Sequence, residues 1–203
     1  MKNDSNPVAI ARDLTWTLKL PLPQHDVNTL REVYESKGLV PLMYAMQQHV
    51  RIDCTIVLRR GGAEFKDPHI QNAPLLPPYG TTQFRGSRVT VCLPRTFIRD
   101  APFATLVYAI AHEYAHIVLY ATRNAWRDSE RATDVCASML GYEDVVCDGH
   151  QYLTQRTEVR TKKMCWGLLS RKEVYRIEQR KGYGYLSADE RAGLRLFVKS
   201  LRA

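Results

Sequence analysis

The run of residues 104–121 constrains the fold of this chain more than any other segment. Apart from Thr105, His112, Glu113 and His116, every residue in it is apolar or aromatic. Such a run predicts a helix buried on most sides, about 27 Å long at ~1.5 Å per residue. Its three central ionisable side chains argue against a membrane span, because charges at mid-membrane are costly and rare. We therefore expect a buried helix of a globular protein, with no membrane partner.

His112, Glu113 and His116 form a His-Glu-x-x-His motif on this predicted helix. At about 100° per residue, the two histidines lie ~40° apart on one face, so both imidazoles can reach one metal ion. Glu113 projects ~100° from His112, beside the metal, where a general base for a metal-bound water belongs. The alternative is a polar cluster on a solvated face. That alternative is weak here, because unpaired ionisable groups in a buried helix are costly and a bound cation offsets the cost.

A third ligand is expected on the next predicted helix, at residues 129–140. Glu130 and Asp134 stand four residues apart there and share one face, while the opposite face has the apolar spacing of a core contact. Glu130 would complete a His₂Glu site and leave one zinc position open for water, which is the catalytic arrangement. Asp134 would accept the N–H of a ligand histidine and fix its tautomer. The alternative for Glu130 is a first-turn carboxylate favoured by the helix dipole.

With ExxxD at Glu130 and Asp134 following HExxH, the chain resembles the gluzincin branch of the zincin metallopeptidases. The resemblance covers about residues 85–142 and is greatest to small cytosolic members of the ImmA/IrrE type or to minimal M48-like members. It implies that His112, His116 and Glu130 bind Zn²⁺, that Glu113 is the catalytic base, and that Asp134 orients a histidine. Asp134 departs from the ImmA/IrrE type, which usually has Asn there.

Period-two alternation at residues 50–60 predicts a strand, and the run Arg-Val-Thr-Val-Cys-Leu at residues 88–93, which Pro94 ends, predicts a second one. With the two motif helices they predict an α+β fold, in which a zincin-like core contains a small mixed or antiparallel sheet. We expect strand 88–93 to form the edge of the cleft and to bind an extended peptide by strand addition. A further donor should stabilise the oxyanion. His150 is our assignment for this catalytic role, with Tyr142 and Tyr152 as other candidates and an ordinary loop histidine as the alternative.

The charge of the chain is concentrated near its end. The chain has 29 Lys and Arg against 21 Asp and Glu, a formal net charge of +8, and the whole excess lies in residues 152–203. We expect residues 1–25 to be a loosely ordered N-terminal arm and residues 26–151 to be the metallopeptidase core. Residues 152–203 should form a basic helical extension, a helical hairpin whose last helix starts at a capping box, Ser187 to Glu190.

The basic extension suggests a partner. DNA, RNA or an acidic protein could bind it by salt-sensitive attraction, although solvated charges on a packed hairpin are the alternative. Five cysteines without a CxxC pair, and an N-terminus lacking an uninterrupted apolar stretch, predict reduced thiols in a cytoplasmic protein.

The sequence therefore predicts a zinc metallopeptidase that hydrolyses a specific protein or peptide substrate, with Glu113 activating a zinc-bound water. Two alternatives stay open. One is a regulatory or nucleic-acid-binding protein with a structural or inactive zincin core, and the other is an exported toxin or effector metalloprotease.

Overall fold

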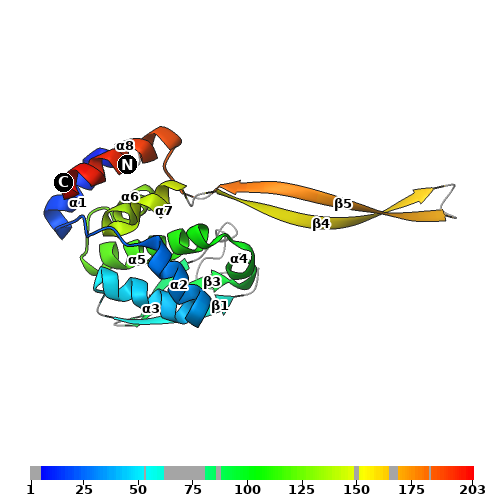
Figure 1. Cartoon of the computed structure of the whole chain (residues 1–203), viewed down its shortest axis with the longest axis horizontal. Coiled ribbons are helices and arrows are strands. Elements are labelled where there is room, and N and C mark those ends of the chain that lie inside the picture. Colours follow the sequence, from blue (N-terminus) through cyan, green and yellow to red (C-terminus); the bar gives the residue numbers. More distant parts are fainter. Residues whose placement is uncertain are drawn as a thin grey trace. The chain divides into compact units, whose positions relative to one another are not determined.

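The computed structural model describes residues 6–52, 54–61, 81–85, 88–148, 151–164, 169–182 and 184–203. Its described residues form a mostly helical α+β fold with a mixed three-stranded sheet and a separate two-stranded sheet (Figure 1). This confirms the predicted α+β class and the small mixed sheet. The chain divides into two compact units. The main unit comprises residues 1–150 and 184–203, and the hairpin unit comprises residues 151–183.

The main unit contains helices and one short sheet. Its elements, in chain order, are α1 (Pro7–Leu18), α2 (Val27–Lys37), α3 (Leu39–Val50), β1 (Thr55–Gly61), β2 (Thr81–Arg85), β3 (Arg88–Pro94), α4 (Arg95–Asp100), α5 (Phe103–Ala121), α6 (Glu130–Ala137), the π-helical turn η1 (Ser138–Tyr142), α7 (Glu143–Asp148) and α8 (Ala188–Arg202).

Helix α5 is the centre of the main unit and contacts α6, α3, α7 and β2 (Figure 1). It is buried along most of its length, as its apolar composition predicts. Pro102 caps its start, since a proline needs no backbone hydrogen bond there, and separates it from the short helix α4. Among the described residues, no helix is both long and apolar enough to cross a membrane.

The strand order of the three-stranded sheet corrects one prediction. β3 is the central strand, paired in parallel with β1 and antiparallel with β2. It therefore has no free edge for a peptide, and the expectation that residues 88–93 form the edge of the cleft is wrong. Within the described chain, β2 is the edge strand on the side of the sheet where Thr82 contacts Glu113 of α5. Residues 81–85 are only five long, which is why their alternation did not stand out in the sequence.

The described part of the predicted loose arm contains a helix, α1, contrary to that prediction. Asn6 caps helix α1 by accepting a hydrogen bond from the backbone N–H of Val8. Ile10, Ala11 and Leu14 are buried on one face of α1, and α1 contacts α6 and α8. The apolar side chains recur at i, i+1 and i+4, so one face of the helix is available to the core.

We expect Leu14→Ala to destabilise the protein by about 2–5 kcal/mol, because the Leu14 side chain is fully buried and its removal leaves a cavity. Trp16→Ala is the matched control, since the Trp16 side chain on the same helix is 82% exposed. Urea unfolding measures both changes. An equal, small effect of the two substitutions would mean that α1 does not pack on the core.

The hairpin unit also differs from the prediction of a helical extension over residues 152–203. Residues 152–203 do not form a helical hairpin, because β4 (Gln151–Met164) and β5 (Leu169–Gly182) pair as antiparallel strands over 14 cross-strand positions. β-branched residues, including Thr157, Val159 and Thr161, recur along β4 and favour strand over helix. Only the last predicted helix is confirmed, as α8, with both hydrogen bonds of its Ser187–Glu190 capping box present. It belongs to the main unit.

Candidate metal centre

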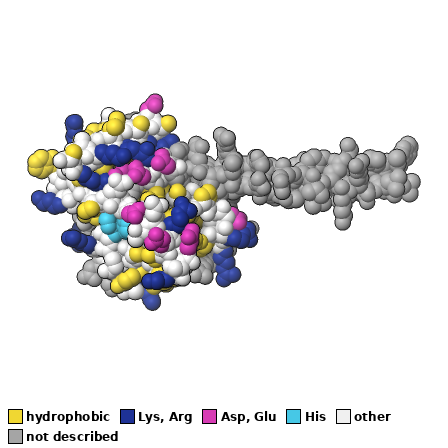
Figure 2. All heavy atoms as spheres, in the orientation of Figure 1, with side chains coloured by type: hydrophobic (Ala, Val, Ile, Leu, Met, Phe, Trp, Pro, Cys, Tyr) yellow, Lys and Arg dark blue, Asp and Glu magenta, His cyan; other side chains and the backbone are white. Residues whose placement is uncertain are grey.

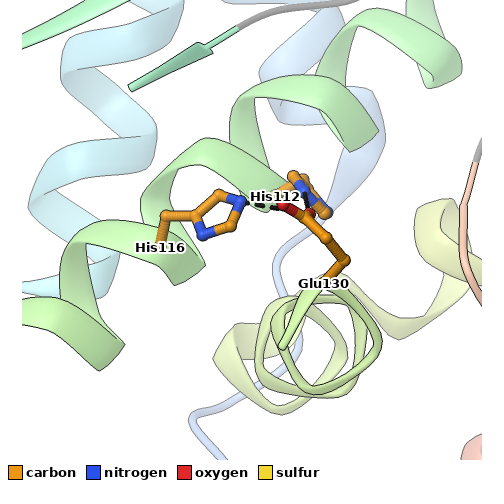
Figure 3. Close-up of side chains that lie close together, drawn as sticks. All are labelled: His112, His116 and Glu130. Atoms are coloured by element: carbon orange, nitrogen blue, oxygen red, sulfur yellow. Dashed lines mark hydrogen bonds and ion pairs between the residues drawn. The ribbon is translucent and has the colours of Figure 1, made fainter. Parts of the chain in front are cut away.

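Two adjacent helices bring three candidate metal ligands together. His112 and His116 lie one turn apart on α5, and Glu130 lies in the first turn of α6, which Ser129 caps through its side chain. One potential ligand atom from each residue lies within 4.8 Å of the others. In Figure 3 the His116 imidazole and the Glu130 carboxylate point toward one another from α5 and α6. The structure thus assembles the three ligands expected from the sequence.

The spacing of these atoms suits a small tetrahedral cation. Glu130 Oε2 lies 3.1 Å from His112 Nε2 and 3.3 Å from His116 Nε2. Donors at about 2.0–2.1 Å from a tetrahedral zinc lie ~3.3 Å from one another. The Glu130 oxygen therefore already lies at the separation from each imidazole nitrogen that such an ion requires, and the ligand atoms of the two histidines lie within 4.8 Å of each other.

Asp134 holds the His112 ring from the opposite side. Its Oδ1 lies 2.8 Å from His112 Nδ1 and accepts a hydrogen bond from the Tyr108 hydroxyl at 2.7 Å. Its Oδ2 accepts a bond from the backbone N–H of Tyr185 at 2.6 Å. Asp134 is 1% exposed, so this carboxylate is buried and its hydrogen bonds set its position. With the proton of the His112 imidazole on Nδ1, the Nε2 lone pair faces Glu130 and is free to bind a metal.

The electrostatics of His112 show why a cation fits here. The imidazole lies between two carboxylates, those of Asp134 and Glu130. Burial lowers the pKa of His112, but both carboxylates outweigh it and raise that pKa to about 10. Burial likewise opposes ionisation of Glu130, yet the two imidazoles hold its pKa well below the usual range. Positive charge is therefore strongly favoured between His112 and Glu130, and a metal ion can supply it in place of a proton.

Glu113 is placed beside the ligands but outside the ligand group. It is 3% exposed and its Oε2 accepts a hydrogen bond from the Thr82 hydroxyl on β2 at 2.5 Å. Burial raises the pKa of Glu113, while the charges of His112 and His116 oppose that rise. A raised carboxyl pKa is the property that a general base working near neutral pH needs.

The three candidate ligands differ in how far their side chains are exposed to solvent. The side chain of His112 is 4% exposed, that of His116 22% and that of Glu130 48%. The Glu130 side of the cluster is thus open to solvent, whereas the His112 side is closed. A structural zinc site has all its positions filled by protein ligands. This site is instead open on one side, so a small molecule or peptide could approach it.

The candidate oxyanion donors are not placed at this site. His150 lies outside the described residues, and the side chain of Tyr152 does too. Tyr142 is buried between His25 and His49, with ring centroids 5.7 Å from both, and its hydroxyl has no hydrogen-bond partner in the described structure. The ring contacts of Tyr142 are therefore with His25 and His49, and not with the three candidate ligands.

The structure adds residues that the sequence did not indicate, namely Thr82, Tyr108 and Tyr185. The Tyr185 ring stacks on His112 with centroids 5.9 Å apart. The preceding Gly184 has φ +98°, and a Cβ there would meet the Tyr108 hydroxyl at 3.0 Å. The one available signal was the Gly-Tyr-Gly-Tyr run at residues 182–185, whose glycines permit this close approach.

We expect Asp134→Asn to weaken zinc binding about 10–100-fold, because the amide no longer accepts the His112 N–H as a carboxylate does. Tyr108→Phe is the matched control, since it removes one hydrogen bond to Asp134 and leaves the carboxylate in place. Competition with a chromogenic zinc chelator gives both affinities. Equal affinities for Asp134→Asn and the unmodified protein would show that Asp134 does not support a ligand.

No family model matches the chain, and comparisons with curated proteins and with solved structures find no match. The function proposed below therefore depends on the geometry and charges of the site.

Proposed function

We propose that this protein is a zinc-dependent metalloendopeptidase of the gluzincin type. The observation that carries the proposal is the convergence of His112, His116 and Glu130 on one point, with the buried carboxylate of Glu113 beside them. The chemistry of the donors suits zinc, which binds imidazole nitrogen and carboxylate oxygen in catalytic sites. Three protein ligands with an open side leave room for water or substrate.

The residues have separate roles in this proposal. Bound zinc would polarise a peptide carbonyl and acidify a water molecule. Glu113 takes the proton of the attacking water and passes it to the leaving amine, so that the peptide bond breaks and the proton is conserved. Thr82 orients the Glu113 carboxylate through its hydroxyl. Asp134 fixes His112 by accepting its Nδ1 proton, and the half-exposed ring of Tyr185 closes one side of the site.

The substrate would lie along β2. This strand is an edge of the described sheet and carries Thr82 next to Glu113, so an extended peptide could add to it by backbone hydrogen bonding. A cavity of about 630 Å³ lies further along β2 and α5, which both contribute to its lining. Its apolar wall includes Ile117 and the stacked rings of Phe84 and Tyr120.

The rim of this cavity is basic. Arg51, Arg123 and Arg127 line it, and Arg127 is 3.6 Å from Asp128. Ile117 and Tyr120 follow His116 on α5, so the cavity is within about one to two helical turns of the metal ligands. We therefore infer that the preferred peptides carry an acidic side chain, Asp or Glu, near the bond that is cut.

Digestion of peptide libraries by the zinc-loaded protein tests the proposal. Mass spectrometry should find internal cleavage that a chelator stops and zinc restores, with acidic residues enriched near the cut. Peptides with lysine in place of these acids are the matched comparison. Cleavage that persists in chelator, or no cleavage of any library or denatured protein by zinc-loaded protein, would contradict the peptidase proposal.

A further inference from the structure

We propose that the hairpin unit binds duplex DNA through its phosphate backbones. This inference is independent of the peptidase proposal. Residues 151–183 contain nine Lys and Arg but only three Asp and Glu, a net charge of +6 out of the +8 of the whole chain. The basic residues are Arg156, Arg160, Lys162, Lys163, Arg171, Lys172, Arg176, Arg180 and Lys181.

The rest of the chain is nearly neutral, with 20 basic and 18 acidic residues once those of the hairpin unit are set aside. On the face of the main unit in Figure 2, basic and acidic side chains are intermingled. Several basic side chains of the main unit form ion pairs, such as Arg131 with Glu190 and Arg195 with Asp148. The excess charge is therefore a property of the hairpin unit and not a general feature of the surface.

The strand register spreads this charge along the whole hairpin. Fourteen paired positions, with intervals of about 3.4 Å between them, make a ribbon ~44 Å long from the first position to the last. Basic residues stand from the Tyr152–Lys181 pair near one end to the Lys163–Ser170 pair near the other. A line of charge this long matches a rod-shaped polyanion, which carries one negative charge per ~1.7 Å of duplex. A single phosphate or carboxylate would need only a compact cluster.

One group of cations has no acidic residue opposite it. The register pairs Lys162 directly with Arg171, and the neighbouring pairs contain Lys163 and Lys172. Like charges directly opposite one another destabilise a sheet, so the pairing of Lys162 with Arg171 disfavours the free hairpin. Of the acids, only Glu173 stands opposite a basic residue, Arg160. A bound anion would relieve the repulsion, which is the charge complementarity that points to phosphate.

The shape of the unit also fits DNA. It is a sheet of two strands, with no third strand among the described residues. A two-stranded ribbon is narrow enough for the major groove of B-DNA, which is ~12 Å wide, whereas a larger sheet is not. Isolated two-stranded hairpins are only marginally stable, so a ligand along the ribbon would add the stability that a third strand otherwise gives.

Fluorescence anisotropy with a labelled 30-base-pair duplex tests the proposal. We expect the 203-residue chain to bind it at low salt, with log affinity falling linearly with log salt. The Glu113→Gln variant should bind the duplex equally well. Replacing Lys162, Lys163, Arg171 and Lys172 by Gln should weaken binding on the order of 10-fold or more. It should also make the salt slope shallower by about 2–4.

Two further variants test whether weaker DNA binding comes from loss of charge on the hairpin unit. The alternatives are loss of charge anywhere on the protein and local unfolding of the hairpin. Replacing the exposed Lys19, Lys37, Arg88 and Lys199 of the main unit by Gln removes the same charge and should leave binding nearly unchanged. Exchanging Lys162, Lys163 and Lys172 for Arg and Arg171 for Lys keeps the charge, and should preserve binding even if the Gln variant unfolds locally.

Several results would overturn the proposal. They are no binding of the duplex at low salt, equal loss in the main-unit variant, or loss in the charge-preserving variant. Tighter binding to vesicles containing anionic lipid, or to polyglutamate, than to the duplex would also overturn it, by assigning the ribbon to a membrane or to an acidic protein.

Discussion

Glu113→Gln is expected to lower kcat for peptide hydrolysis about 10²–10⁴-fold while zinc stays bound. The amide has nearly the shape of the carboxylate and can still accept the Thr82 hydrogen bond, but it cannot take a proton from water. Glu113 is also outside the group of ligand atoms that could hold the metal, so zinc affinity should hardly change. Peptide cleavage assays and zinc analysis of the same preparation measure the two effects.

Glu35→Gln is the matched control, since it makes the same chemical change at an exposed position on α2. It should keep full activity. Unchanged hydrolysis by Glu113→Gln would refute the assignment of the base. Loss of zinc together with activity would instead place Glu113 among the ligands, contrary to the proposed roles.

Removal of zinc is expected to abolish hydrolysis and to lower the melting temperature. Zinc that binds only the folded chain stabilises it by about 2.7 kcal/mol at a free concentration of 100 times its Kd. Glu130→Ala should lose most of this stabilisation, because it removes the ligand contributed by α6. Thermal unfolding with added zinc and with chelator measures the shift.

Asp128→Ala is the control for Glu130→Ala, because it removes a carboxylate two residues away that is 90% exposed. It should keep the zinc-dependent shift. A shift of equal size in Glu130→Ala and the unmodified protein would exclude Glu130 as a ligand, and a shift in neither would exclude the site.

Zinc binding should also depend on pH. Without metal, the pKa of His112 is raised to about 10, so its imidazole carries two protons at neutral pH. Zinc must displace one of them, and each unit of falling pH below that pKa should weaken apparent zinc affinity about tenfold from this group alone. Calorimetric titrations in buffers of different ionisation enthalpy count the protons released. No release at neutral pH would contradict this account of His112.

The ligand cluster could be predicted because its information is local. The spacing of His112 and His116 places both on one face of a helix, and the apolar neighbours show that this face is buried. Glu130 and Asp134 follow the same rule on the next helix. Tyr108 and Thr82 reach the site by contacts between elements distant in sequence, and neither has a spacing that marks it.

The spacing of the basic residues after position 152 did not predict the secondary structure of that segment correctly. The basic residues after position 152 are compatible with helical spacing, but β-branched residues and cross-strand pairing determine the observed hairpin. In α1, the short apolar face of Ile10 and Leu14 becomes informative only once α6 and α8 are seen to cover it. The strand order that makes β2 an edge is likewise a property of the tertiary fold.

Zinc K-edge X-ray absorption of the zinc-loaded protein tests the central claim most directly. The site predicts one zinc per chain with about four nitrogen or oxygen donors at ~2.0–2.1 Å, and outer-shell scattering from two imidazoles that falls in His116→Ala. A sulfur donor at ~2.3 Å, or a spectrum unchanged by His116→Ala, would place zinc elsewhere and contradict the proposed site.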